Sequence, residues 1–124
     1  MNAQFRRVSG TIAGTDRDST HSVLFWISVI QSFGDAATED IFHGTNSKVA
    51  RRIPKDLWPV VRRKLDLVNA VTNATALRVP PGNRLEALEG DRAGSFSIRV
   101  NDQYRITFRF EGEHAHDVMC EDYH

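Results

Sequence analysis

The chain ends in three residues whose side chains can transfer protons. Asp122, Tyr123 and His124 close a sequence of 124 residues. A carboxylate and an imidazole often serve as general base and general acid, and a phenol can donate a proton or stack on a planar ring. Chain ends usually fray, so these residues can form a site only if a regular element just before them holds the tail in place.

Positive charge is concentrated in the middle of the chain, although the formal net charge of the whole is zero. Residues 48–109 contain thirteen lysines and arginines against six aspartates and glutamates, an excess of +7. Such an excess suits a polyanion, because each neutralised phosphate releases condensed counterions, but it also occurs on ordinary solvated surfaces. If the polyanion is RNA, the tail can supply the proton transfers of cleavage, and Arg105 the cation that stabilises the phosphate. A terminal Asp-Tyr-His can also arise by chance.

Two histidines close together raise a metal hypothesis. His114 and His116 lie two residues apart, which on a strand puts both on one face, but no third ligand is evident. Exposed histidines near a turn are the simpler interpretation, so neither a metal nor another cofactor is expected. Cys120 is the single cysteine and has no internal disulfide partner, which favours a reducing cytoplasm.

The tail is expected to leave the end of an antiparallel sheet. Apolar and polar residues alternate over 96–100 and over 104–110, with Asn101-Asp102 as a two-residue turn between them. A third strand over 114–122 follows a turn at 111–113 and carries the chain to its last residues. One face of this meander is apolar, and the other carries Arg99, Arg105 and Arg109.

Helices are expected ahead of this sheet. The pattern indicates a short strand at 30–33, a brief helix over 34–44 capped by Asp35, and about one helical turn over 47–53. The clearest helix has an apolar stripe on one face, cations on the other and a proline in its first turn. The stripe is Leu57, Val61, Leu65 and Val68, the cations are Arg62, Arg63 and Lys64, and the proline is Pro59. Residues 73–84 are expected to be a loop, because two prolines and a glycine at 80–82 stop any regular element.

This order predicts an α+β fold, with N-terminal helices packed on one face of a small, mostly antiparallel sheet. Residues 29–124 are expected to form its one domain. Residues 1–28 are predicted to be a leader that is disordered or not natively translated, with translation starting at Val29 from a GTG codon. The apolar run at 23–30 is too short to span a bilayer, and no cleavage site for export follows it.

Several stretches together resemble one family. IQSFGDAATEDIFHG, RRKLDLVNAV, LRVPPGNRLEALEGDRAGSFSIRVNDQYRITFRF and the closing DYH are similar to the HigB toxins of the RelE-like superfamily. The resemblance implies a RelE-like fold and a ribosome-dependent endoribonuclease that cuts translated mRNA and inhibits growth. It also implies silencing by a HigA-type helix-turn-helix antitoxin, through which the complex holds operator DNA, and no metal, organic cofactor or membrane.

The resemblance assigns site residues as well. The family's C-terminal catalytic residues fall on Asp122, Tyr123 and His124, and its phosphate-supporting arginine falls on Arg105. RNA would be cleaved by its own 2′-OH, leaving a 2′,3′-cyclic phosphate; which of Asp122 and His124 is base and which acid stays open. Residues expected to contact RNA are Arg84, Arg92, Arg99 and Arg109.

Two acidic residues depart from the family pattern. Where active members read RLHALKG, this chain reads RLEALEG, with Glu86 and Glu89. Glu89 replaces a cation with an anion that repels phosphate, whereas Glu86 can still act as a base. We therefore expect reduced or altered nuclease activity, with Glu89 as the residue to suspect. The alternative is a weakly active or inactive homologue that serves mainly as an antitoxin-binding partner in operon autoregulation.

Overall fold

A computed structural model describes residues 29–123 of the chain, so the predictions made for residues 1–28 and for His124 lie outside the described residues. Within this range the elements follow the order α3, α4 and then the strands, with short 3-10 helices, labelled η, in the connections. Helices precede the sheet, and the predicted α+β class is confirmed.

The sheet has four strands in the order β1-β2-β3-β4 within residues 29–123, and every neighbouring pair is antiparallel. The strands are β1 (Glu86–Ala87), β2 (Ser95–Arg99), β3 (Tyr104–Glu111) and β4 (His114–Asp122). The predicted three-strand meander is therefore confirmed. Strand β1 was not expected: its two residues are too few to show an alternating pattern, and the pairing of Glu86 with Ser97 defines it.

The two α-helices form as their sequences indicate. Helix α3 (Ala36–Phe42) begins after Asp35, whose side chain accepts a hydrogen bond from the backbone N–H of Thr38 at 2.9 Å. Helix α4 (Trp58–Val68) has its proline in the first turn, where no intrahelical N–H is lost. The buried residue of that first turn is Trp58 rather than Leu57. The short 3-10 helices are η1 (Ala50–Arg52), η2 (Lys55–Leu57), η3 (Ala74–Arg78), η4 (Pro81–Asn83) and η5 (Gly90–Arg92).

The predicted strand at 30–33 is an extended segment joined to β4 by two isolated parallel bridges rather than a regular strand. The backbone of Gly34 donates to Val118 at 2.8 Å, and Ser32 accepts from the N–H of Asp117 through its hydroxyl at 2.9 Å. The segment therefore covers the outer edge of β4, which would otherwise expose unpaired backbone groups.

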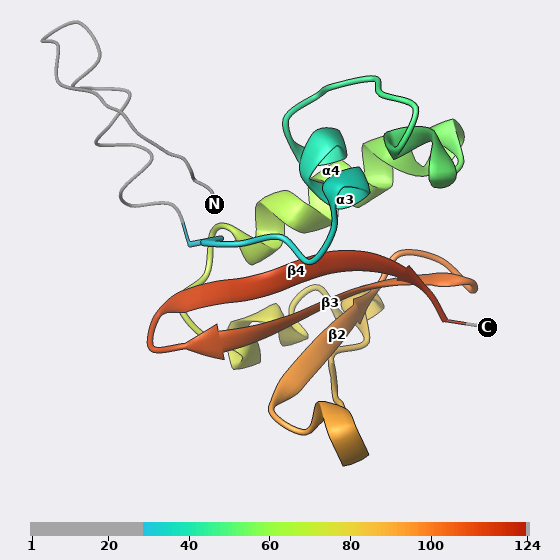
Figure 1. The fold of residues 1–124 in the computed structure, drawn as a ribbon. Helices are drawn as coiled ribbons and strands as arrows, with labels where there is room; N and C mark the ends of the chain where they lie inside the picture. The colour runs from blue at the N-terminus through green and yellow to red at the C-terminus, as the bar shows by residue number, and fades with distance from the viewer. Residues whose placement is uncertain (1–28, 124) are drawn as a thin grey trace, which may run out of the picture.

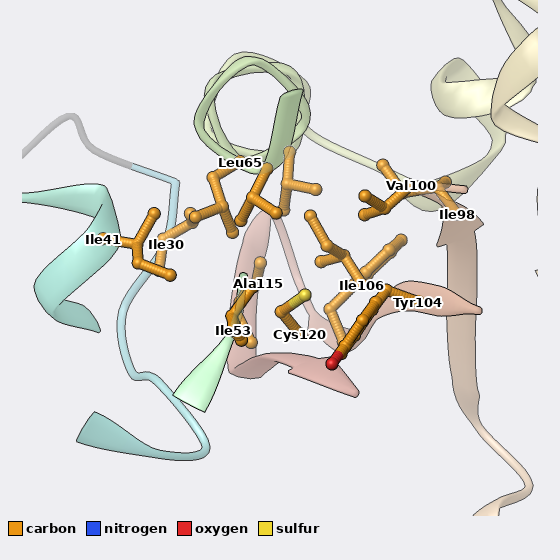
Figure 2. Packing of buried hydrophobic residues seen from close by; sticks show 14 of the residues in the cluster. Ile30, Ile41, Ile53, Leu65, Ile98, Val100, Tyr104, Ile106, Ala115 and Cys120 are labelled. Atoms are coloured by element: carbon orange, nitrogen blue, oxygen red, sulfur yellow. The ribbon is translucent and has the colours of Figure 1, made fainter. Parts of the chain in front are cut away.

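The core lies between the helices and one face of the sheet. Figure 1 shows α3 and α4 together on one side of the sheet, beyond β4. In Figure 2, Leu65 reaches from α4 toward Ile106 and Cys120, and all three are fully buried. Burying one aliphatic side chain of this size contributes roughly 1.5–3 kcal/mol, so this layer accounts for much of the packing that keeps the sheet in place.

The three cations opposite the apolar stripe of α4 differ in their surroundings. Arg62 donates to the carbonyl of Ile41 at 3.2 Å and so ties α4 to α3. Lys64 donates to the side-chain oxygen of Asn83 at 2.5 Å, whereas Arg63 is exposed. Two of the three cations therefore make contacts that join α4 to its neighbours.

A bulge sets the faces of the last strand. The β3–β4 register shifts by one residue between Thr107 and Arg109. Asp117 takes up the extra residue with φ of 56°, a left-handed conformation that aspartate adopts more readily than most residues. Beyond the bulge, Val118 and Cys120 point into the core, while Glu121 pairs with Arg105 on the opposite, open face.

Candidate active site

A cleft of about 440 Å³ lies on the open face, at the end of the sheet where β4 finishes. Most of its lining comes from three places: the loop before β1, the β2–β3 turn and the tail. The lining residues are Arg84, Glu86, Arg99, Asn101, Asp102, Arg105 and Tyr123. Three arginines and two acids thus surround one space. The residues predicted from the sequence to be catalytic or RNA-binding that line it are Arg84, Glu86, Arg99, Arg105 and Tyr123.

Arg105 forms the floor of this cleft and is only 8% exposed. Its Nε donates to the hydroxyl of Ser97 at 2.7 Å, and its Nη2 donates to the carbonyl of Arg84 at 2.5 Å. These contacts satisfy a buried cation that would otherwise cost several kcal/mol to desolvate. Among residues 29–123, Nη1 has no hydrogen-bond acceptor, which leaves one edge of the guanidinium available to an anion in the cleft.

Tyr123 lies over Arg105. The ring centroid is 5.8 Å from the guanidinium carbon, and the residue is 41% exposed. Its backbone N–H donates to the carbonyl of Gln103 at 2.6 Å, which extends the β3–β4 pairing one residue past the strand. The tail is therefore held by β4 up to this point, as the sequence required, and an aromatic face remains open beside a cation.

Asp122 is placed differently. It pairs with Tyr104 at the end of β4, and its carboxylate accepts a hydrogen bond from the side chain of Gln103 at 2.9 Å. It is exposed and does not line the cleft. The structure thus brings Tyr123 and Arg105 together, whereas Asp122 is not among the residues that line the cleft.

The two glutamates that depart from the family pattern, Glu86 and Glu89, lie in different places. Glu86 lines the cleft, and its carboxylate lies 3.9 Å from Nη2 of Arg105, with the side chain 58% exposed. Glu89 lies past β1, immediately before η5, and is exposed outside the cleft. The acid that faces the buried arginine is therefore Glu86.

The remaining arginines of the open face are paired with acids. Arg99 contacts Asp102, and Arg109 contacts both Glu111 and Asp117. These two acceptors raise the pKa of Arg109 above its ordinary value through hydrogen bonds. The predicted arginine-bearing face is present, but acids offset much of its charge.

Arg92 crosses the open face to reach β4. Its guanidinium donates twice to Glu121, at 3.0 and 2.5 Å, and Thr107 donates to the same carboxylate at 2.5 Å. The hydrogen bond from Arg92 is the main reason why the pKa of Glu121 is lowered. Arg92 and Arg109 line a second cleft of about 480 Å³, apart from the one that holds Arg105.

Two polar residues that support the site were not singled out in the sequence. Ser97 and Asn83 are both fully buried, Ser97 against Arg105 and Asn83 within the loop before β1. The available signal was the PPGNR stretch, which composition identified only as a loop. Nothing local distinguishes a buried loop asparagine from an exposed one.

No group of three or more potential metal ligands occurs in the portion from 29 to 123. His116 lies 3.7 Å from Glu111, and His114 is exposed on the same strand. The helices of that portion include none long and apolar enough to cross a membrane.

A family model described as the RelE-like toxin of type II toxin-antitoxin system HigB matches residues 31–124. The chain belongs to the HigB-like toxin family. This HigB-like toxin is 45% identical over 65 residues to Toxin HigB-1 of Vibrio cholerae serotype O1, a match that covers 52% of this chain and 68% of that protein. It is also 40% identical over 70 residues to an uncharacterized protein of Haemophilus influenzae, covering 56% of this chain and 69% of that protein.

Solved structures show a more distant likeness to this HigB-like toxin. A YoeB/ParE toxin from Agrobacterium tumefaciens has a TM-score of 0.46 and 18% identity, covering 76% of this chain and 99% of that one. A YoeB-YefM complex from Staphylococcus aureus has a TM-score of 0.45 and 13% identity, covering 77% and 97%. The fold assignment rests on the helices and sheet described above.

Proposed function

We propose that this HigB-like toxin is a metal-independent endoribonuclease that cleaves translated mRNA on the ribosome in the cytoplasm and is neutralised by a HigA-type antitoxin. The observation that supports this most is the meeting of Arg105, Tyr123 and Glu86 in one cleft. A buried cation, an exposed aromatic ring and a carboxylate can together hold an RNA phosphodiester, stabilise its charge and supply a general base.

The proposed reaction uses the 2′-OH of the RNA as nucleophile. As the 2′-oxygen bonds to phosphorus and the bond to the 5′-oxygen breaks, a base takes the 2′ proton and an acid protonates the leaving oxygen. Glu86 is the carboxylate in the cleft closest to Arg105 and is our candidate base. His124 is the candidate acid, and Arg105 stabilises the charge on the non-bridging oxygens.

To bind a phosphate, an arginine of the cleft must exchange its present carboxylate partner for the phosphate. The Arg99–Asp102 pair is open to solvent, with the Asp102 side chain 94% exposed, so exchanging this carboxylate for a phosphate costs little. Tyr123 offers its face to a base, since single-stranded RNA is commonly held by stacking on aromatic side chains.

The decisive experiment is induction of the toxin without antitoxin, with growth and the 5′ ends of cellular mRNA followed. We expect growth arrest and new ends within translated regions, with a 5′-hydroxyl on one product and a 2′,3′-cyclic phosphate on the other. His124→Gln should remove both effects, whereas the double variant His114→Asn/His116→Asn should keep them. Loss of cleavage in the latter would argue against metal independence.

A second function is favoured by the 3.9 Å approach of Glu86 to Arg105 and by the acids that offset the other arginines. If Glu86 acts as a competitor for phosphate, the protein is a weak nuclease that serves mainly as the antitoxin's partner in operon autoregulation. Normal growth on induction, together with co-purification of the antitoxin and a shift of operator DNA by the complex, would support this function instead.

A further inference from the structure

A buried asparagine organises the loop between α4 and the cleft. The side chain of Asn83 is fully buried, and its amide nitrogen donates to the carbonyls of Leu77 at 3.1 Å and Val79 at 3.3 Å. Its side-chain oxygen accepts from the ammonium of Lys64 on α4 at 2.5 Å. Both donors and the acceptor of the amide are therefore used inside the protein.

The residue after Asn83 turns this loop toward Arg105. Arg84 has φ of 46° and ψ of 57°, in the left-handed region, which residues other than glycine rarely adopt. In this conformation its carbonyl accepts the 2.5 Å hydrogen bond from Nη2 of Arg105. A continuous set of contacts thus joins Lys64, Asn83, the backbone of Arg84 and Arg105.

We propose that Lys64 and Asn83 are positioning residues for Arg105, acting through the carbonyl of Arg84. The proposal rests on the nuclease function above, because it assigns the two residues to the cation of that reaction. Ser97 fixes the Nε side of the guanidinium through its hydroxyl, and its carbonyl accepts only a long hydrogen bond of 3.4 Å from Nη2. The 2.5 Å hydrogen bond to the Arg84 carbonyl is therefore the shorter of the two contacts that set how the Nη2 side is turned. Without the Arg84 carbonyl, Nη2 keeps only the 3.4 Å contact with Ser97, and it can close the 3.9 Å gap to Glu86 and bind the carboxylate instead of the phosphate.

The chemistry of each residue type fits this role. Aspartate at position 83 has no N–H to donate, and it would set a carboxylate against the carbonyls of Leu77 and Val79. At position 64 the charge is held at a cost, since burial first, and the charges of Arg63 and Arg99 next, lower the pKa of Lys64. The hydrogen bond from Lys64 to Asn83 offsets part of this cost.

The test uses Lys64→Met, which keeps the unbranched stem of the side chain and removes the donor, and Asn83→Ala. Arg63→Met, an exposed cation beside Lys64, is the matched control for charge. Lys64→Arg tests rescue by another donor. Arg84→Gly separates the two contributions of that residue, because glycine accepts the left-handed backbone and keeps the carbonyl while losing the guanidinium.

Two readouts are needed for the folded full-length variants: mRNA cleavage on isolated ribosomes and the NMR signal of the Arg105 Nε–H. We expect Lys64→Met and Asn83→Ala to slow cleavage of bound mRNA about tenfold, leave ribosome affinity unchanged and shift the Arg105 signal. Arg63→Met should change neither readout, and Lys64→Arg should recover part of both. Arg84→Gly should keep the Arg105 signal while weakening RNA binding.

The outcome that overturns the proposal is a lower melting temperature for Lys64→Met and Asn83→Ala with cleavage and the Arg105 signal both unchanged. In that case the contacts only stabilise the loop. If the wild type does not cleave mRNA at all, the proposed function fails, but the Arg105 signal still decides whether Lys64 and Asn83 position the guanidinium.

Discussion

The ring of Tyr123 lies over the buried guanidinium of Arg105, 5.8 Å from centroid to carbon, at the point where β4 ends. The pair presents an aromatic face and a cation to the same cleft. A nucleotide has two parts that match them, a base that stacks and a phosphate that needs positive charge.

This relationship predicts how Tyr123 can be replaced. Tyr123→Phe keeps the ring and should retain most of the cleavage activity, whereas Tyr123→Ala should lose roughly 10- to 100-fold, since stacking a base contributes about 1–3 kcal/mol. The measurement is the cleavage rate of a reporter mRNA on ribosomes. Equal losses in the two variants would mean that the phenol hydroxyl, rather than the ring, carries the function.

Arg105 should not tolerate lysine. The guanidinium donates through Nε to the Ser97 hydroxyl and through Nη2 to the carbonyls of Arg84 and Ser97, and a lysine ammonium cannot reproduce this geometry. We expect Arg105→Lys to reduce cleavage at least about 100-fold, the scale of losing one preorganised transition-state donor. Ser97→Ala, which removes one partner and keeps the cation, should give a smaller loss. A fully active Arg105→Lys would show that charge alone suffices at this position.

Glu86 and Glu89 should respond in opposite directions. With Glu86 as base, Glu86→Gln should lower cleavage about 100-fold or more. Glu89→Lys adds a cation outside the cleft and should raise growth inhibition modestly through attraction of RNA. Both variants are compared at equal expression in a growth assay. Increased toxicity of Glu86→Gln would instead identify this carboxylate as a competitor for Arg105, which supports the weak-nuclease function.

The link between Arg92 and Glu121 should make stability depend on pH. The Arg92 hydrogen bond lowers the pKa of Glu121 in the folded protein, so the folded state binds fewer protons there than the unfolded state. Its stabilisation is present above the ordinary carboxyl pKa of about 4.3 and is lost as the pH falls through the lower folded value.

We therefore expect wild type to lose more stability than Glu121→Gln on acidification from pH 7 to 3. The difference should be on the order of 0.5–1 kcal/mol, because the pair is partly exposed. Urea unfolding at several pH values measures it, with Glu113→Gln, in the exposed turn before β4, as control. Parallel pH profiles for wild type and Glu121→Gln would exclude this contribution.

Much of the fold could be predicted because its elements are long enough to show a period. Alternation over 104–110 and the stripe through Val61 and Leu65 each repeat several times, and both elements form where expected. Strand β1 has two residues and no period of its own, so only its pairing with β2 reveals it.

Several residues of the site could be predicted from the sequence, but the contacts between them could not. Resemblance pointed to Arg105 and Tyr123, which do meet in the cleft. The burial of Arg105 and the pairing of Arg92 with Glu121 depend on residues 8 to 29 positions apart, and single-residue properties carry no information about such contacts. For the same reason, the sequence favoured Glu89 over Glu86 as the residue that reduces nuclease activity, although Glu86 is the one of the two that faces the Arg105 guanidinium.

The extra residue at Asp117 has a consequence for how the last strand can change in length. Side chains alternate along β4, and the bulge shifts that alternation by one step, so that Glu121 and Tyr123 share the open face with Arg105. Removing or adding a single residue between the bulge and Tyr123 would turn the ring toward the helices. An insertion or deletion in this stretch therefore keeps the Tyr123 ring on the open face only if it changes the length by an even number of residues.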